Sequence, residues 1–212
     1  MNCLGYEDVV NILDCISKVM SQKESELCGM DAQMGDGDLG ITMRKGWKAV
    51  AEAAHTLDES DIGRLLMKCG MKLSSAAPST MGTLMASALM SGGQALMGKN
   101  TMDSAGLADY LQGFCDGIIK RGKCQPGDRT VLDSIWPAAQ EARKHHEISI
   151  MSAEAVLLAS REGLESTKKM EPKFGKAAVF ASKADGVEDQ GAVVGFLIVQ
   201  CICQYIIKLL KG

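Results

Sequence analysis

The stretch GAVVGFLIVQCICQYIIKLL, residues 191–210, decides between a membrane-spanning fold and a soluble one. Its uncharged run, residues 191–207, has 17 residues, which is the lower limit for a helix that crosses a bilayer. Gln200, Gln204 and Lys208 recur every four residues, so a helix would place them on one face. An apolar helix with a single polar stripe is typical of a protein core. We therefore expect the final helix of a soluble protein, with no membrane association.

The rest of the chain also shows helical periodicity. Apolar residues recur every three to four positions within residues 7–20 and 61–73. Aromatic residues, which favour strands, make up only 4% of the 212-residue chain, whereas methionine occurs 14 times. The sequence predicts an all-α fold of about eight helices, and its length suits a single domain over residues 1–212, or at most two small ones. The predicted helices span residues 7–20, 46–56, 61–73, 81–97, 104–120, 129–145, 152–168 and 190–210.

Local signals refine these helices. Pro137 falls inside the range 129–145 and is expected to kink or split that helix. The segment AAVFAS, residues 177–182, is the one stretch that reads as a short extended piece. Four residues stand at expected N-caps, where a side-chain oxygen accepts a backbone N–H: Asp61, Asp103, Asp128 and Ser152.

The composition excludes several classes of protein. The chain has 23 basic and 26 acidic residues, a net charge of −3, and no stretch that combines clustered Lys and Arg with aromatics. A nucleic-acid partner is therefore not expected. The eight cysteines form no CxxC pair and no regular framework, which argues against a disulfide scaffold. Because the start, MNCLGYEDVV, does not read as a signal peptide, the cytoplasm is the expected compartment.

The acidic segment DAQMGDGDLG, residues 31–40, contains three aspartates within eight positions and no basic residue. Two carboxylates about 8 Å apart repel by roughly 2 kcal/mol at an effective dielectric near 20. A bound cation would relieve this repulsion. An EF-hand loop counted from Asp31 would need a glutamate at its twelfth position, which is Thr42 here.

A magnesium site fits the acidic segment more easily. Mg²⁺ accepts a few carboxylates and completes its octahedron with water and phosphate oxygens. Gly35, Gly37 and Gly40 would let the backbone turn tightly and approach phosphates. Two alternatives stay open from spacing alone. One is a glycosidase-type carboxylate pair, which requires two different environments across a cleft, and the other is a solvated acidic turn.

Three further segments are poor helix material. SSAAPSTMGT, residues 74–83, reads either as a simple cap and turn or as an anion site at a helix N-terminus. RGKCQPGDRT, residues 121–130, contains a Pro-Gly-Asp turn. The segment at residues 173–192 is irregular over about 20 positions, and loops of that length inside a compact domain are usually functional or disordered.

These segments together resemble a known family. DAQMGDGDLGITM (31–43) is similar to the three-aspartate loop of the L subunits of dihydroxyacetone kinases, and the likeness continues along the chain in order. It includes GMKLSS (70–75) with GT (82–83), GIIKRGKCQPGDRTVLDSIWPA (117–138) and GKAAVFASKADGVEDQGA (175–192). The resemblance implies an antiparallel barrel of eight helices, with a nucleotide held by the loops at one end.

The resemblance also implies the site residues. Asp31, Asp36 and Asp38 would form the catalytic centre and bind two magnesium ions that bridge to the nucleotide phosphates. Gly122 and Val131 would border the base and ribose. The full set implied to contact ADP or ATP is Leu39, Gly40, Ile41, Thr42, Ser79, Thr80, Gly122, Val131, Lys176, Asp189, Gln190 and Gly191.

The chain departs from the family pattern at several of these positions. Leu39 stands where the family has histidine or threonine, and the loop around Ser79 is shorter and lacks a glycine-rich run. Lys176 stands where the family has arginine, which keeps the charge but loses the bidentate fork. Gln190 replaces the proline of an Asp-Pro-Gly sequence. Such changes would suit another ketose substrate, a different partner or weaker nucleotide retention.

The family's activity gives the expected function. Its L subunit passes phosphate to a ketose held by a histidine of a separate K subunit, and magnesium neutralises the transferring phosphoryl group. Nothing in this chain resembles a K domain, so we expect a phosphotransferase subunit that is active only with a partner K subunit. Three histidines lie outside the matched segments and are expected to face solvent: His55, His145 and His146.

The sequence leaves the phosphoryl donor open. ADP could stay bound and be rephosphorylated by a phosphotransferase-system protein, the M subunit, or ATP could exchange freely. The substrate could be dihydroxyacetone or a related ketose such as erythrulose. A non-catalytic nucleotide-binding regulator is the alternative from another class, although such a module need not keep metal ligands. The oligomeric state, a homodimer included, is also open.

Overall fold

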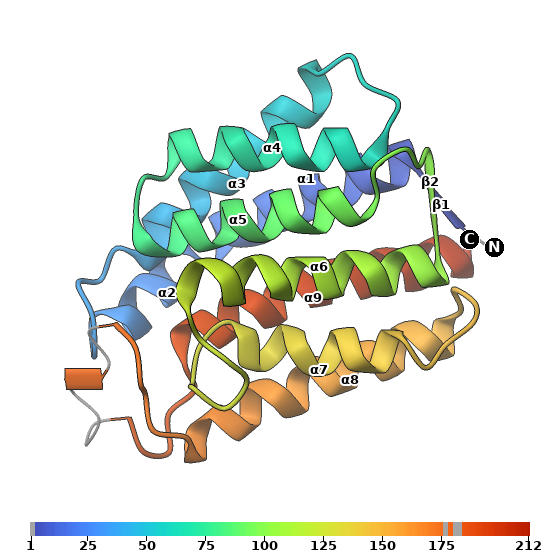
Figure 1. Cartoon of the computed structure of the whole chain (residues 1–212). Coiled ribbons are helices and arrows are strands. Elements are labelled where there is room, and N and C mark those ends of the chain that lie inside the picture. Colours follow the sequence, from blue (N-terminus) through green and yellow to red (C-terminus); the bar gives the residue numbers. More distant parts are fainter. Residues whose placement is uncertain (1–2, 176–177, 180–183) are drawn as a thin grey trace.

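The computed structural model describes residues 3–175, 178–179 and 184–212, and this part of the chain is mainly helical (Figure 1). The all-α prediction is confirmed. Strand β1 (Cys3–Gly5) pairs antiparallel with β2 (Thr101–Asp103), and a 3₁₀ helix, η1, spans Thr167–Lys169. The described residues form the following α-helices: α1 (Tyr6–Gln22), α2 (Glu24–Asp31), α3 (Leu39–Thr56), α4 (Ile62–Ala76), α5 (Thr80–Ala95), α6 (Ser104–Gly122), α7 (Leu132–Ala142), α8 (Ile150–Ser166) and α9 (Gln190–Lys211).

Most helices pack against their neighbours in sequence. From α3 onward each helix packs against the next one along the chain, while α1 packs against α3 and α9. Successive helices from α3 to α9 alternate in direction (Figure 1). The N-termini of α3, α5, α7 and α9 therefore lie at one end of the molecule, on the left in Figure 1, and the chain termini lie toward the other end. The closed barrel of eight helices stays a prediction.

Helix α9 is a core helix, as the polar stripe predicts. Within the described residues it is the one helix long and apolar enough to cross a membrane, and 61% of its most apolar window is buried inside the protein. It packs against α1, α7 and α8. Gln204 and Lys208 are exposed and Gln200 is half-buried, so the polar stripe faces outward.

Two of the four predicted N-caps are confirmed and two are wrong. Asp61 accepts the backbone N–H of Arg64 at 3.0 Å, and Asp103 accepts that of Gly106 at 2.7 Å. Helix α8 begins earlier than predicted, at Ile150, because Ser149 is its N-cap and forms a capping box with Ser152. Helix α7 begins later, at Leu132, because the side chain of Asp128 instead accepts the N–H of Gln125 and closes the preceding turn.

Some helix boundaries also differ from the prediction. Helix α3 starts at Leu39, directly after the acidic segment, and not at residue 46. The short helix α2 was not predicted, because its apolar residues form no clear stripe. Pro137 lies inside α7 and does not split it. The predicted extended piece at 177–182 lies mostly outside the described residues.

Candidate functional site

The loops at the end where the helix N-termini meet enclose a cavity of about 510 Å³. The acidic segment contributes one side of it, and the N-termini of α5 and α9 contribute two others. Most of the residues predicted to form the site line this cavity. They are Asp31, Asp36, Asp38, Leu39, Thr42, Ser79, Thr80, Val131, Asp189, Gln190 and Gly191. We call this space the acidic cavity.

A second cavity, of about 440 Å³, adjoins the acidic cavity. The two share lining residues from α5, the α6–α7 loop and the segment after η1, among them Thr80, Val131 and Phe174. Gly122, the last residue of α6, lines this second cavity only. The carboxylates line the acidic cavity alone, whereas Leu84, Val131 and Phe174 belong to the wall of both cavities.

The acidic segment folds into a compact cluster of carboxylates. Asp31, Asp36 and Asp38 each place one carboxylate oxygen within 4.8 Å of the other two. Asp31 ends α2 and is 8% exposed, and its Oδ2 accepts the backbone N–H of Gly37 at 2.9 Å and of Asp38 at 3.1 Å. These two bonds fold the segment back onto the end of α2. Asp31 is therefore both a wall of the cavity and the anchor of the loop.

The carboxylate cluster has the chemistry of a divalent-cation site. Its donors are hard oxygen atoms, which Mg²⁺ prefers, and they converge closely enough to share a cation. Gly35 packs directly against Asp31, because a Cβ at residue 35 would overlap the Asp31 carboxylate. Gly37 adopts a left-handed φ of 77°, which favours glycine. The sequence thus supplies glycine at the two positions where the loop needs close approach or a positive φ.

The start of α5 forms the second side of the acidic cavity. Ser79 is the N-cap of this helix, and its Oγ accepts the backbone N–H of Gly82 at 3.1 Å. Thr80 is the first helical residue. Backbone N–H groups at such a helix start can bind anions, and here they lie beside a cavity large enough for one. The two readings of this segment, cap and anion site, are therefore compatible.

The start of α9 forms the third side. Asp189 is its N-cap, 6% exposed, and its Oδ2 accepts the N–H of Ala192 at 2.8 Å. Burial raises the pKa of Asp189 to about 6. The backbone hydrogen bonds from Ala192 and Gly191 and the charge of Arg129 oppose this rise. Gln190 donates its Nε2 to Oδ1 of Asp31 at 3.3 Å. This bond links the final helix directly to the carboxylate cluster.

Among the described residues, two of the predicted site residues line neither the acidic cavity nor its neighbour. Gly40 lies where α3 crosses α2, and a Cβ there would overlap the backbone oxygen of Glu24. Because glycine has no side chain, α2 and α3 can come into contact at this residue. Ile41 is 39% exposed on α3 and lines neither cavity. Lys176 lies outside the described residues.

The structure also brings a residue to the site that the sequence reading treated only as part of a turn. Arg129 lines the acidic cavity, is 3% exposed and has a left-handed φ of 59°. Its Nη2 donates to the backbone oxygen of Val187 at 2.8 Å. The signal in the sequence was the cation inside the Pro-Gly-Asp turn, but no local pattern shows that this side chain turns inward.

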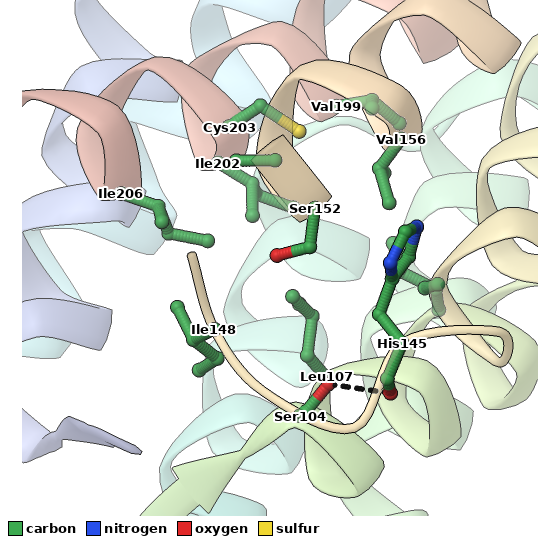
Figure 2. A pocket seen from close by; sticks show the side chains of 13 residues that line it. Ser104, Leu107, His145, Ile148, Ser152, Val156, Val199, Ile202, Cys203 and Ile206 are labelled. Atoms are coloured by element: carbon green, nitrogen blue, oxygen red, sulfur yellow. Dashed lines mark hydrogen bonds between the residues drawn. The ribbon is translucent and has the colours of Figure 1, made fainter. Parts of the chain in front are cut away.

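A third hollow lies among α6, α8, α9 and the loop before α8, and Figure 2 shows it. It holds only about 10 Å³, which is room for at most one water molecule. His145 lines it with 23% of its side chain exposed, and its backbone oxygen accepts Oγ of Ser104 at 2.9 Å. The prediction that all three histidines face solvent is therefore wrong for His145. His55 and His146 are exposed.

The fold and the site together define a class of protein, an all-helical domain that gathers three aspartates beside a cavity at one end. The chain matches the DAK2 domain family over residues 33–204 and belongs to this family. It is 27% identical over 202 residues to the PEP-dependent dihydroxyacetone kinase, ADP-binding subunit DhaL, of Escherichia coli (strain K12), and the match covers 94% of this chain and 96% of that one.

Other relatives are longer than this chain. It is 31% identical over 193 residues to the D-erythrulose kinase of Mycolicibacterium smegmatis, covering 89% of this chain but 33% of that one. Among solved structures it resembles the dihydroxyacetone kinase from C. freundii in complex with AMP-PNP and Mg²⁺, with a TM-score of 0.71 and 24% identity. That likeness covers 92% of this chain and 33% of the kinase, and it bears on the fold alone.

Proposed function

We propose that this chain is the nucleotide-binding, phosphoryl-transferring L subunit of a dihydroxyacetone kinase. One observation carries the proposal, namely the convergence of Asp31, Asp36 and Asp38 within 4.8 Å of one another on the wall of the acidic cavity. The similarity to the E. coli ADP-binding subunit, which extends over nearly the whole of both chains, supports it. The domain would comprise residues 1–212 and act in the cytoplasm.

Each side of the site has a distinct role in this proposal. The three aspartates hold two magnesium ions, which supply charge neutralisation to the phosphates when bound. The N–H groups at the starts of α3 and α5 orient phosphate oxygens, with Ser79 fixing the α5 turn through Gly82. Gly122 and Val131 border the base and ribose in the second cavity. Leu39, which is 5% exposed, stands where the family has a polar residue. It gives the cavity an apolar wall that excludes water in place of a polar contact.

The protein itself contributes positioning more than covalent chemistry. Phosphoryl transfer needs no nucleophilic side chain on the nucleotide-binding subunit, because the ketose is the acceptor. Gln190 and two backbone N–H groups hold Asp31 in one orientation, so the cluster is organised before a nucleotide arrives. The acceptor ketose would be held on a separate K subunit. The phosphoryl donor would be ATP in solution, or a phosphotransferase-system M subunit acting on bound ADP.

A related ketose is the second candidate substrate. The 31% identity to the D-erythrulose kinase of M. smegmatis exceeds the 27% identity to the E. coli dihydroxyacetone kinase subunit. The match covers a third of that longer kinase. Phosphorylation of dihydroxyacetone and of erythrulose, assayed with candidate K subunits, separates the two substrates.

The central test is nucleotide binding and transfer by variants of the cluster. Calorimetric titration with ADP and Mg²⁺ measures binding, and phosphate transfer with a K subunit measures activity. Asp36→Asn and Asp38→Asn are expected to lose magnesium-dependent binding and transfer. Asp109→Asn, an exposed aspartate on α6, is the matched control and is expected to keep both. Wild-type protein that binds no nucleotide in the presence of Mg²⁺ would refute the proposed function.

A further inference from the structure

A group of buried charged residues, to which the proposed function assigns no role, adjoins the acidic cavity, and Arg129 and Asp189 of this group line it. Asp128, Arg129, Asp133 and Asp189 are each between 3% and 6% exposed. Buried charges are unfavourable unless they are paired or hydrogen-bonded, so each of them needs a partner. These residues come from the α6–α7 loop, the first turn of α7 and the N-cap of α9. They therefore lie where two of the cavity-forming segments meet.

The three carboxylates are satisfied without a described hydrogen bond or ion pair to the guanidinium of Arg129. Asp128 pairs with Nζ of Lys173 at 2.7 Å. Asp133 accepts the backbone N–H groups of Gly127 at 2.5 Å and of Thr130 at 2.7 Å. Asp189 accepts the N–H of Ala192. The carboxylates thus serve mainly to shape the backbone, and none of them ties down the guanidinium.

Arg129 itself makes one described hydrogen bond, from Nη2 to the backbone oxygen of Val187 at 2.8 Å. Its Nε and Nη1 are buried and have no hydrogen-bond partner among the described residues. A guanidinium carries five N–H donors and normally uses most of them when buried. This side chain therefore holds unused donors and a positive charge in the wall of a cavity that four carboxylates also line, those of Asp31, Asp36, Asp38 and Asp189.

The turn that carries Arg129 is built to direct it inward. A φ of 59° is a backbone conformation that L-residues rarely adopt, so the surrounding structure must impose it. Asp133 does so, because its two carboxylate oxygens hold the N–H groups on either side of Arg129, at Gly127 and Thr130. The side chain then reaches Val187, two residues before the N-cap of α9. One turn of the α6–α7 loop is thus tied to the segment that leads into α9.

We infer that Arg129 is a positioning residue of the nucleotide site: it fixes the segment before α9 against the α6–α7 loop and supplies a buried positive charge beside the bound phosphates. The inference rests on the proposed function for its ligand, a magnesium-bound nucleoside diphosphate or triphosphate. By fixing residues 187–189, Arg129 sets the start of α9 and hence the bond from Gln190 to Asp31. Its charge also keeps the neighbouring carboxyl of Asp189 ionised more readily than burial alone would allow.

The test compares Arg129→Met and Arg129→Lys with wild type, using Arg64→Met as the matched control. Arg64 is an exposed residue at the start of α4, at the opposite end of that helix from the acidic cavity. Two quantities are measured, the dissociation constant for ADP with Mg²⁺ between pH 5.5 and 8.5, and amide hydrogen exchange of residues 184–192 without nucleotide. Circular dichroism checks that each variant is folded.

Arg129→Met is expected to weaken ADP binding at least tenfold and to increase exchange at residues 184–192 severalfold. The midpoint pH of the change in its ADP affinity should be higher than that of wild type. The charged groups that act on the Asp189 carboxyl are Arg129 and Asp133, and removing the cation leaves burial and a like charge to favour the protonated form. Arg129→Lys keeps the charge but not the fork, so its pH midpoint should stay near that of wild type while exchange rises. Arg64→Met should match wild type in every measurement.

Unchanged exchange at residues 184–192, or unchanged binding and pH midpoint, in folded Arg129→Met would overturn the inference. If Arg129→Met does not fold, Arg129→Lys decides through the exchange measurement, and wild-type exchange there would overturn it equally. Failure of the proposed function looks different. In that case wild-type protein binds no ADP with Mg²⁺, whereas the exchange experiment still reports whether Arg129 holds the segment before α9.

Discussion

Replacing Gly35 with alanine tests the carboxylate cluster without changing any charged side chain. A Cβ at residue 35 would overlap Oδ1 of Asp31 and lie 2.9 Å from both its Cγ and its backbone oxygen. Gly35 is not one of the glycines with a positive φ, so its backbone conformation is open to alanine. The collision with Asp31 is therefore the whole perturbation. Because it involves a backbone oxygen as well as the carboxylate, the carboxylate has to turn away and the loop backbone has to shift.

The size of the effect follows from the bonds that Asp31 makes. Its Oδ2 holds the N–H groups of Gly37 at 2.9 Å and Asp38 at 3.1 Å, and its Oδ1 accepts Gln190. A hydrogen bond to a charged group contributes about 1.5–3 kcal/mol. We expect Gly35→Ala to lower the free energy of unfolding by roughly one such bond. Displacing one of three ligands should also weaken magnesium-dependent ADP binding by about tenfold or more.

Gly29→Ala is a matched control on α2. A Cβ at residue 29 has nothing within 4 Å, so alanine there should leave binding unchanged and alter stability by less than about 1 kcal/mol. Calorimetric titration with ADP and Mg²⁺ gives the dissociation constant, and thermal unfolding without metal gives the change in stability. If Gly35→Ala binds and unfolds like Gly29→Ala, the close contact between Gly35 and Asp31 is not what orders the cluster, and the reasoning is refuted.

Three further predictions follow from the same site. Asp36→Asn and Asp38→Asn should each abolish phosphate transfer with a K subunit. The metal-free variants should be at least as stable as wild type, because like-charge repulsion is relieved. Near-normal activity of either variant would argue against the metal site. Lys176→Ala should weaken ADP binding by a factor of about 10 to 100, because one charge-assisted hydrogen bond is lost. An unchanged dissociation constant would indicate that Lys176 is solvated and does not contact the nucleotide. Asp189→Asn should raise the free energy of unfolding by up to about 3 kcal/mol at pH 7.5 and by only about 1 kcal/mol at pH 4.5. Burial raises the folded-state pKa of Asp189 from 3.8 to about 6, so the stability of wild type falls as pH rises between these values. Urea unfolding measures the change in the free energy of unfolding, and an equal change at both pH values would contradict this prediction.

The helices could be predicted from sequence because their apolar stripes are local and periodic. The prediction for α9 depended on three polar residues at a spacing of four, and the structure buries residues 191–199 and 201–203 of that helix. Boundaries were less accurate where two neighbouring side chains compete for the same backbone groups. Asp128 has the residue type of an N-cap, yet Asp133 takes the N–H groups of this turn and delays the start of α7 to Leu132. Residue type alone does not show which of two nearby carboxylates accepts these N–H groups.

The acidic cluster could be anticipated from spacing, but its surroundings could not. Three aspartates within eight positions are close in any compact loop. The contact between Gln190 and Asp31, by contrast, joins residues 159 positions apart, and no periodicity connects them. The expectation that these segments meet came from resemblance to a family. Arg129 was missed for a related reason. A cation next to a Pro-Gly-Asp turn normally faces solvent, and the inward direction of Arg129 shows only in its burial and in its bond to Val187, 58 positions away.

The link between Gln190 and Asp31 also explains how the site can differ from its relatives while keeping the cluster. A proline at the first position of a helix has no side chain that can donate a hydrogen bond, whereas Gln190 donates to Asp31 and leaves its own Oε1 buried without a partner among the described residues. An amide in this place can hold the carboxylate in the metal-free state and offer an acceptor to a donor that enters with the nucleotide. The acidic loop is then supported from α9 by a side chain and not only by its own backbone. That support depends on where α9 begins, which the turn around Arg129 and the N-cap at Asp189 determine together.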